Sequence, residues 1–145
     1  MASPQTIAAL RRLFAAEFRC PTARWHQAMP YIEWNDTNEE AALRAVAAED
    51  REHLAWLSEL LLARGSSPPP ASYATATAET HYVQLQALLP RLIRAERELI
   101  AAYQSAGAAL ADDPEAARRV SEITGRHTRH LETLQRLSQQ QPLGT

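Results

Sequence analysis

Residues 50–57, Asp50-Arg51-Glu52-His53-Leu54-Ala55-Trp56-Leu57, decide the fold because they set charged groups into an apolar helical stripe. The stretch His127-Thr128-Arg129-His130-Leu131-Glu132-Thr133-Leu134 repeats the pattern: an ionisable residue, two others, His-Leu, two others and Leu. Burying an unpaired charge costs several kcal/mol. Both stretches therefore indicate helices whose polar residues share a buried partner.

Two isolated acids interrupt the apolar stripes of two further helical segments. Glu17 precedes His53 by 36 positions and Glu96 precedes His130 by 34, so the chain carries a faint internal repeat. The candidate metal ligands are Glu17, Asp50, His53, Glu96, His127 and His130. Carboxylate oxygen together with imidazole nitrogen suits iron, manganese or zinc better than calcium or magnesium.

Helical periodicity predicts four helices, which cover residues 4–29, 37–64, 78–110 and 113–139. Thr37 and Glu40 have the spacing of a capping box at the start of the second helix, and Gly65 is suited to end it. Asp113 followed by Pro114 is a typical start for the fourth helix.

The long connection between the second and third helices decides the topology. The other two connections are short, so each should join an antiparallel hairpin. Residues 65–77 contain three consecutive prolines and, when extended, span about 40 Å, which is also about the length of the second helix. We therefore expect the third helix to start parallel to the second. Pro21 and Pro90 are expected to kink the helices that contain them, because proline lacks a backbone N–H.

Composition narrows the class of protein. A length of 145 residues suits a single domain, and a net charge of −2 gives no reason to expect nucleic acid or a membrane as partner. Cys20 is the single cysteine, which excludes an intrachain disulfide, and we expect it to pack as a small apolar residue. Because no leader and no long apolar run is seen, we expect a soluble cytoplasmic protein. Residues 139–145 are expected to be a disordered tail.

The arrangement resembles the ferritin-like di-metal carboxylate family, which includes ferritins, bacterioferritins and rubrerythrins. The resemblance covers roughly residues 5–138. It implies an all-α, antiparallel four-helix bundle with a long crossover between the second and third helices. That family uses a Glu from each of two helices and a Glu-x-x-His from each of the other two. Glu17 and Glu96 match the isolated Glu residues, and His53 and His130 match the two His residues.

Two positions depart from the family pattern. The run Glu49-Asp50-Arg51-Glu52-His53-Leu54 is similar to the family's Glu-Glu-Arg-Glu-His-Ala, but Asp50 replaces the bridging Glu and is one methylene shorter. His127 replaces the second bridging Glu, and an imidazole presents one lone pair and no negative charge. A single ion or an asymmetric pair of ions is therefore expected.

The resemblance implies an iron- or manganese-dependent oxidoreductase or ferroxidase that reacts with dioxygen or peroxide, with zinc as another occupant in isolated protein. Tyr103, seven residues beyond Glu96, is expected to support the ligands. The alternative is a non-catalytic metal-binding or structural protein whose site is degenerate, since both departures fall on bridging positions. A polar network satisfied without metal also stays open. The sequence indicates no particular substrate.

Three tryptophans bear on the oligomeric state. Trp25, Trp34 and Trp56 exceed what one small bundle is expected to enclose, and exposed aromatic residues mark interfaces. The resemblance implies pairing through the first two helices. We therefore expect a homodimer.

Overall fold

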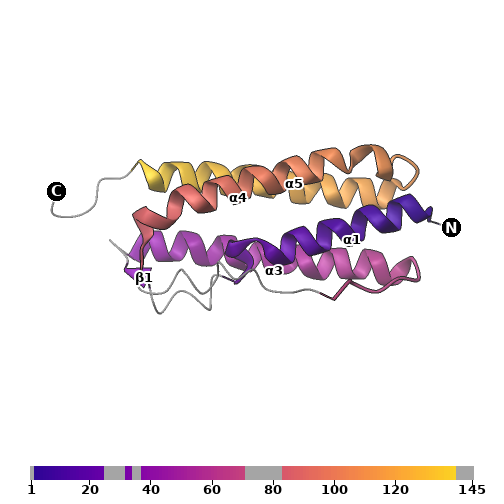
Figure 1. Cartoon of the computed structure of the whole chain (residues 1–145), viewed down its shortest axis with the longest axis horizontal. Coiled ribbons are helices and arrows are strands. Elements are labelled where there is room, and N and C mark those ends of the chain that lie inside the picture. The colour runs from indigo at the N-terminus through magenta and orange to yellow at the C-terminus, as the bar shows by residue number, and fades with distance from the viewer. Residues whose placement is uncertain (1, 25–31, 34–36, 71–82, 140–145) are drawn as a thin grey trace.

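The computed structural model describes residues 2–24, 32–33, 37–70 and 83–139. These residues form four long α-helices: α1 (Pro4–Arg19), α3 (Thr37–Ala63), α4 (Leu85–Ser105) and α5 (Pro114–Ser138). The four helices lie alongside one another in an elongated bundle (Figure 1). The predicted all-α four-helix bundle is confirmed. None of the described helices is both long and apolar enough to cross a membrane.

The helix directions agree with the predicted crossover. α3 and α4 run the same way along the bundle, and α1 and α5 run the opposite way (Figure 1). Two short strands, β1 (Ile32–Glu33) and β2 (Val83–Gln84), pair in parallel near the starts of α3 and α4. The pairing holds both starts at the same end of the bundle. These strands were not predictable from the sequence, because two residues are too few to show an alternating pattern.

The prediction of a first helix over residues 4–29 is wrong beyond Arg19, where α1 ends. A 3-10 turn, η1 (Pro21–Arg24), follows. Pro21 has no N–H for the carbonyl of Glu17, and the N–H of Cys20 donates to that carbonyl instead, at 3.2 Å. Pro21 thus ends the helix rather than kinking it. Residues 25–29 lie outside the described part of the chain.

The predicted third helix, over residues 78–110, is shorter and divided in the structure. α4 covers Leu85–Ser105 and contains Pro90, and a 3-10 turn, η4 (Gly107–Leu110), leads toward α5. Residues 83–84 belong to β2, and residues 78–82 lie outside the described chain. Proline is therefore accommodated inside α4, whereas in α1 it marks the end.

The ends of α3 and α5 follow the predicted capping signals. Gly65 has a φ of 76°, a left-handed conformation that glycine adopts at little cost after a helix. The side chain of Asp113 accepts a hydrogen bond from the N–H of Ala116 at 3.2 Å and so caps α5. Arg64 donates to both oxygens of Asp113, at 2.6 and 2.7 Å, and joins the two ends. The side chain of Thr37, half of the predicted capping box, lies outside the described residues.

The apolar core consists of two clusters at different heights along the bundle. The first apolar cluster contains Leu10, Leu13, Leu57, Leu61, Leu99, Tyr103, Leu110, Val120 and Ile123. The second apolar cluster contains Leu43, Ala47, Leu88, Leu89, Leu92, Leu134 and Leu137. Along α3, α4 and α5, buried ionisable residues occupy the positions between the two. A buried polar layer therefore crosses the middle of the bundle.

Candidate metal centre

All six predicted ligands lie in the polar layer. Glu17 comes from α1, Asp50 and His53 from α3, Glu96 from α4, and His127 and His130 from α5. Five of them are fully buried, and His130 is 3 % exposed. Two groups have donor atoms within 4.8 Å of one another: Glu17, Asp50, His53 and His127, and Glu96, His127 and His130. The structure thus brings all six together, and their role as ligands stays a prediction.

His127 lies at the centre of the polar layer and contacts carboxylates from two helices. Its Nε2 is 2.7 Å from Oε1 of Glu17, and its Nδ1 is hydrogen-bonded to Oε1 of Glu96. The hydroxyl of Tyr103 donates to the same oxygen of Glu17 at 2.7 Å. Tyr103 therefore holds the carboxylate of Glu17, which comes from another helix. Glu96, about two turns earlier in α4, does not receive this hydrogen bond.

His53 and His130 face the buried carboxylates of the polar layer without forming hydrogen bonds to them. Nδ1 of His53 lies 3.3 Å from Oε1 of Glu17 and 3.5 Å from Oδ1 of Asp50. Nδ1 of His130 lies 3.5 Å from the same Asp50 oxygen and 3.7 Å from Oε1 of Glu96. These atoms converge on a shared space from different helices.

Several buried donor and acceptor atoms in this layer have no hydrogen-bond partner among the described residues. They are Oε2 of Glu17, Oδ1 of Asp50, both ring nitrogens of His53, Oε2 of Glu96 and Nδ1 of His130. Leaving such an atom unsatisfied costs about 1–3 kcal/mol. A metal ion that accepts their lone pairs would offset this cost. The donors present therefore fit a metal with oxygen and nitrogen ligands.

Burial and neighbouring charges shift the pKa values of the ionisable residues around His127. Burial opposes ionisation of Glu17, but the positive charges of His127 and His53 and the hydrogen bond from His127 outweigh it and lower the pKa of Glu17 to about 2. Burial also opposes the charged form of His127, yet Glu17 and Glu96 outweigh it and raise its pKa to about 11. Burial raises the pKa of Asp50, although His53 opposes the shift. Without a metal, His127 is thus an imidazolium between two carboxylates.

Thr22 is a contact that the sequence analysis missed. Its hydroxyl donates to Oδ2 of Asp50 from the η1 turn, and Sγ of Cys20 lies 3.2 Å from the same hydroxyl. Burial raises the pKa of the Cys20 thiol, so Cys20 stays protonated, consistent with the small apolar role predicted for it. No sequence signal could have placed Thr22 here, because its position depends on Pro21 turning the chain.

Glu49 is a second contact that the sequence analysis did not single out. Its Oε1 is 2.8 Å from Nε2 of His130, the ring nitrogen that points away from the centre. The carboxylate of Glu49 also pairs with Arg126, at 3.4 Å. The only available signal was its position beside Asp50 in the quoted run of α3.

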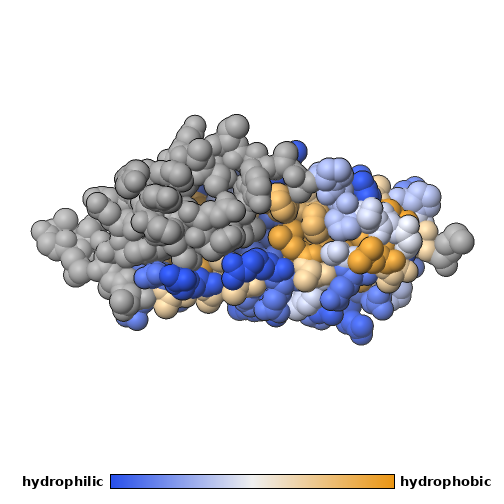
Figure 2. Space-filling model, turned by 90° about the horizontal axis from the view of Figure 1, so that it is seen from below, coloured by the Kyte–Doolittle hydropathy of each residue, from blue (hydrophilic) through white to orange (hydrophobic). Residues whose placement is uncertain are grey.

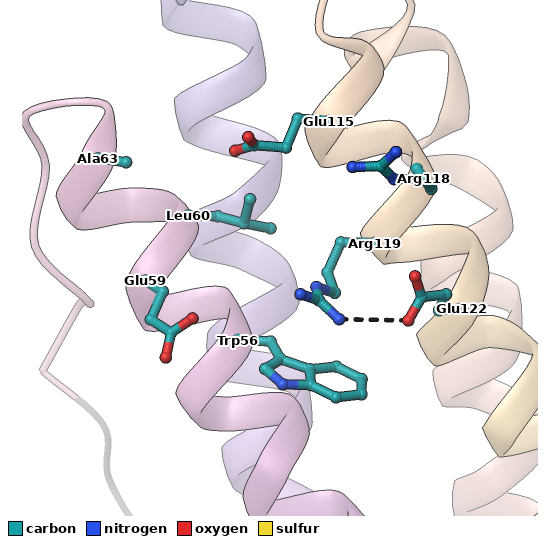
Figure 3. Close-up of a pocket in the computed structure, with 8 residues that line it drawn as sticks. All are labelled: Trp56, Glu59, Leu60, Ala63, Glu115, Arg118, Arg119 and Glu122. Carbon is teal, nitrogen blue, oxygen red and sulfur yellow. Dashed lines mark hydrogen bonds and ion pairs between the residues drawn. The ribbon is translucent and has the colours of Figure 1, made fainter.

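Trp56 lies beside the polar layer and is half-buried. Its ring centroid is 5.7 Å from that of His53, and the guanidinium carbons of Arg119 and Arg126 lie 4.3 and 4.4 Å from the indole centroid. The ring borders a polar hollow of about 400 Å³ between α3 and α5, in which Arg119 pairs with Glu122 (Figure 3). Trp56 is thus covered by α5 rather than presented as a free aromatic surface.

The predicted dimer surface stays a prediction. Trp25 and Trp34 lie outside the described residues. On the face shown in Figure 2, apolar residues gather at the end of the bundle where α1 begins and α3 ends. Among the described large hydrophobic residues, Leu62 of α3 is the exposed one, at 61 %.

Comparison with known proteins establishes the fold. No family model matches the sequence, and no curated protein matches it. A ferritin-like diiron-carboxylate protein from Bacillus anthracis superposes with a TM-score of 0.77 at 19 % identity, covering 94 % of this chain and 99 % of that one. A conserved hypothetical protein from Mycobacterium tuberculosis (TM-score 0.71, 14 % identity) covers 97 % of this chain and 95 % of its own. Antigen TpF1 from Treponema pallidum (TM-score 0.73, 14 % identity) covers 97 % of both chains. The chain therefore has the ferritin-like fold, with a buried carboxylate and imidazole cluster that is consistent with a di-metal site.

Proposed function

We propose that this protein binds iron or manganese in the polar layer and is an oxidoreductase or ferroxidase that acts on dioxygen or peroxide. The observation that carries the proposal is the set of buried, unpartnered carboxylate and imidazole atoms that converge from four helices. Similarity to a ferritin-like diiron-carboxylate protein supports the metal class. A bound ion would supply electron transfer to the oxidant, which none of these side chains supplies alone.

The protein's own residues would orient the donors and exclude water. Tyr103 donates to Glu17, and Thr22 donates to Asp50, so two of the carboxylates are held by hydroxyl groups. The two apolar clusters enclose the layer along the bundle. Hydrogen bonds of this kind fix the orientation of ligating side chains.

The ligand set favours one tightly bound ion per chain. His127 belongs to both groups of donors. A neutral imidazole has one lone pair for a metal, so His127 cannot serve both groups at once. The group of Glu17, Asp50, His53 and His127 offers four of the residues that would hold the ion, and His130, whose Nδ1 lies 3.5 Å from Oδ1 of Asp50, would complete the set. Binding of a second ion per chain with equal affinity would contradict the expectation of one tightly bound ion.

A non-catalytic role is the second candidate, and one observation favours it. Both nitrogens of His127 are already bonded to Glu17 and Glu96, so part of the layer is satisfied by the protein alone. In a non-catalytic protein, the positively charged His127 would take the place of a metal ion between Glu17 and Glu96. The polar layer would then contribute to the stability or shape of the bundle.

Metal analysis of protein purified without chelator tests the proposal. We expect about one ion per chain after anaerobic addition of Fe(II) or Mn(II), and a loss of metal of at least about tenfold in His53→Ala. Glu52→Ala is the matched control, because Glu52 neighbours His53 on α3 but its side chain is 54 % exposed. Wild-type protein that stays nearly free of metal would defeat the metal-binding proposal.

Oxidation of the loaded protein separates the two candidates. We expect Fe(II) bound to wild-type protein to be oxidised by dioxygen or peroxide faster than Fe(II) in buffer, and the Glu52→Ala control to behave likewise. Stoichiometric metal binding without any acceleration would favour the non-catalytic role.

A further inference from the structure

His130 connects the polar layer to the surface of the bundle. Its Nδ1 faces inward, 3.5 Å from Oδ1 of Asp50. Its Nε2 faces outward and lies 2.8 Å from Oε1 of Glu49. The side chain of His130 is 3 % exposed and that of Glu49 is 35 % exposed, so the hydrogen bond lies at the boundary between core and solvent.

Glu49 is itself held in place by α5. Its second oxygen lies 3.4 Å from Nε of Arg126. Arg126 also approaches Glu52, at 3.7 Å, and lies over the Trp56 ring. The carboxylate of Glu49 is therefore fixed between an imidazole on one side and a guanidinium on the other.

A neutral imidazole has one nitrogen that carries a proton and one that carries a lone pair. The hydrogen bond made by one nitrogen determines which of the two is protonated. A carboxylate beside Nε2 favours the proton there, because it accepts from that N–H. The lone pair is then on Nδ1, the nitrogen that faces Asp50 and Glu96. The carboxylate also makes the imidazole a stronger electron donor.

We propose that Glu49 is a positioning residue, which holds His130 with its Nδ1 lone pair directed into the polar layer. The inference rests on the proposed metal binding and adds to it a residue that does not itself face the layer. A surface ion pair with Arg126 alone would contribute little. Glu52 makes such a pair without touching an imidazole, so the chain contains its own control.

Anaerobic titration with Co(II), followed by its visible absorption, tests the proposal. We expect Glu49→Leu to lower Co(II) affinity about 10- to 100-fold, the range found when the partner of a ligating histidine is lost. Glu49→Gln keeps an oxygen that accepts from Nε2–H, so its loss should be smaller. Glu52→Leu should bind as wild type does. Equal affinities for Glu49→Leu and Glu52→Leu would overturn the proposal.

A second measurement does not depend on metal. The ¹⁵N chemical shifts of His130 in metal-free protein, at a pH where the ring is neutral, report which nitrogen carries the proton. We expect the Nε2–H form in wild type and in Glu52→Leu, and a mixture of both forms in Glu49→Leu. An Nδ1–H form in wild type would overturn the role of Glu49. Absence of Co(II) binding together with the Nε2–H form would instead refute the proposed function.

Discussion

Replacing Tyr103 with Phe isolates one hydrogen bond of the polar layer. The hydroxyl is 2.7 Å from Oε1 of Glu17, and the side chain is 1 % exposed. Burial and the neighbouring Glu17 raise the pKa of Tyr103 well above its ordinary value, so the hydroxyl stays a donor. Hydrogen bonds to charged groups contribute about 1.5–3 kcal/mol. We expect Tyr103→Phe to lower the free energy of unfolding of metal-free protein by that amount.

Urea denaturation in the presence of chelator measures the effect, and the slope of the transition should stay unchanged. For a chain of this length each kcal/mol corresponds to about 2–4 °C in Tm. Thr124→Val is the comparison, since the half-buried Thr124 hydroxyl donates to the neutral carbonyl of Val120 at 2.8 Å. That bond should contribute about 0.5–1.5 kcal/mol. A loss in Tyr103→Phe no larger than in Thr124→Val would refute an ionised Glu17 as the acceptor.

Two further predictions concern the ends and the core of the bundle. Asp113→Ala should lower stability at neutral pH by about 1–3 kcal/mol, because it removes a helix cap and a partner of Arg64. Hydrogen bonds from Arg64 lower the pKa of Asp113, so this contribution is full above its ordinary pKa and is lost as pH falls through the lowered value. Urea curves for wild type and variant should therefore converge in strong acid, and a constant difference would contradict the assignment. Leu57→Ala should cost about 2–5 kcal/mol, because Leu57 is fully buried. Leu62→Ala on the same helix should cost less than about 0.5 kcal/mol, and equal losses would contradict the assigned core.

The fold was largely predictable because its strongest signals are local. α5 covers residues 114–138 against a prediction of 113–139, since Asp113 and Pro114 mark its start unambiguously. The end of α1 was not predictable from periodicity, because apolar residues continue past the point where Pro21 removes a backbone donor. Whether proline ends a helix, as at Pro21, or is accommodated within one, as at Pro90, depends on the packing of neighbouring segments.

The residues of the candidate metal centre were predictable where a charged residue interrupts the apolar face of a helix. Glu17 and Glu96 stand at positions where each helix would otherwise continue its apolar face, so their burial followed from periodicity alone. Thr22 and Glu49 do not occupy such positions. Thr22 reaches Asp50 through the η1 turn, and Glu49 reaches His130 because α5 packs beside α3. Contacts of this type require the tertiary arrangement.

The polar layer between the two apolar clusters also restricts how the helices can slide past one another. Leucine-rich layers alone tolerate displacement by one turn, because one leucine replaces another. Here a one-turn shift of α5, about 5.4 Å, would move His127 and His130 toward leucines and leave Glu17 and Glu96 without their partner. Each buried charge left unpaired costs several kcal/mol. The layer therefore selects a single axial alignment of the bundle, whether or not an ion is bound.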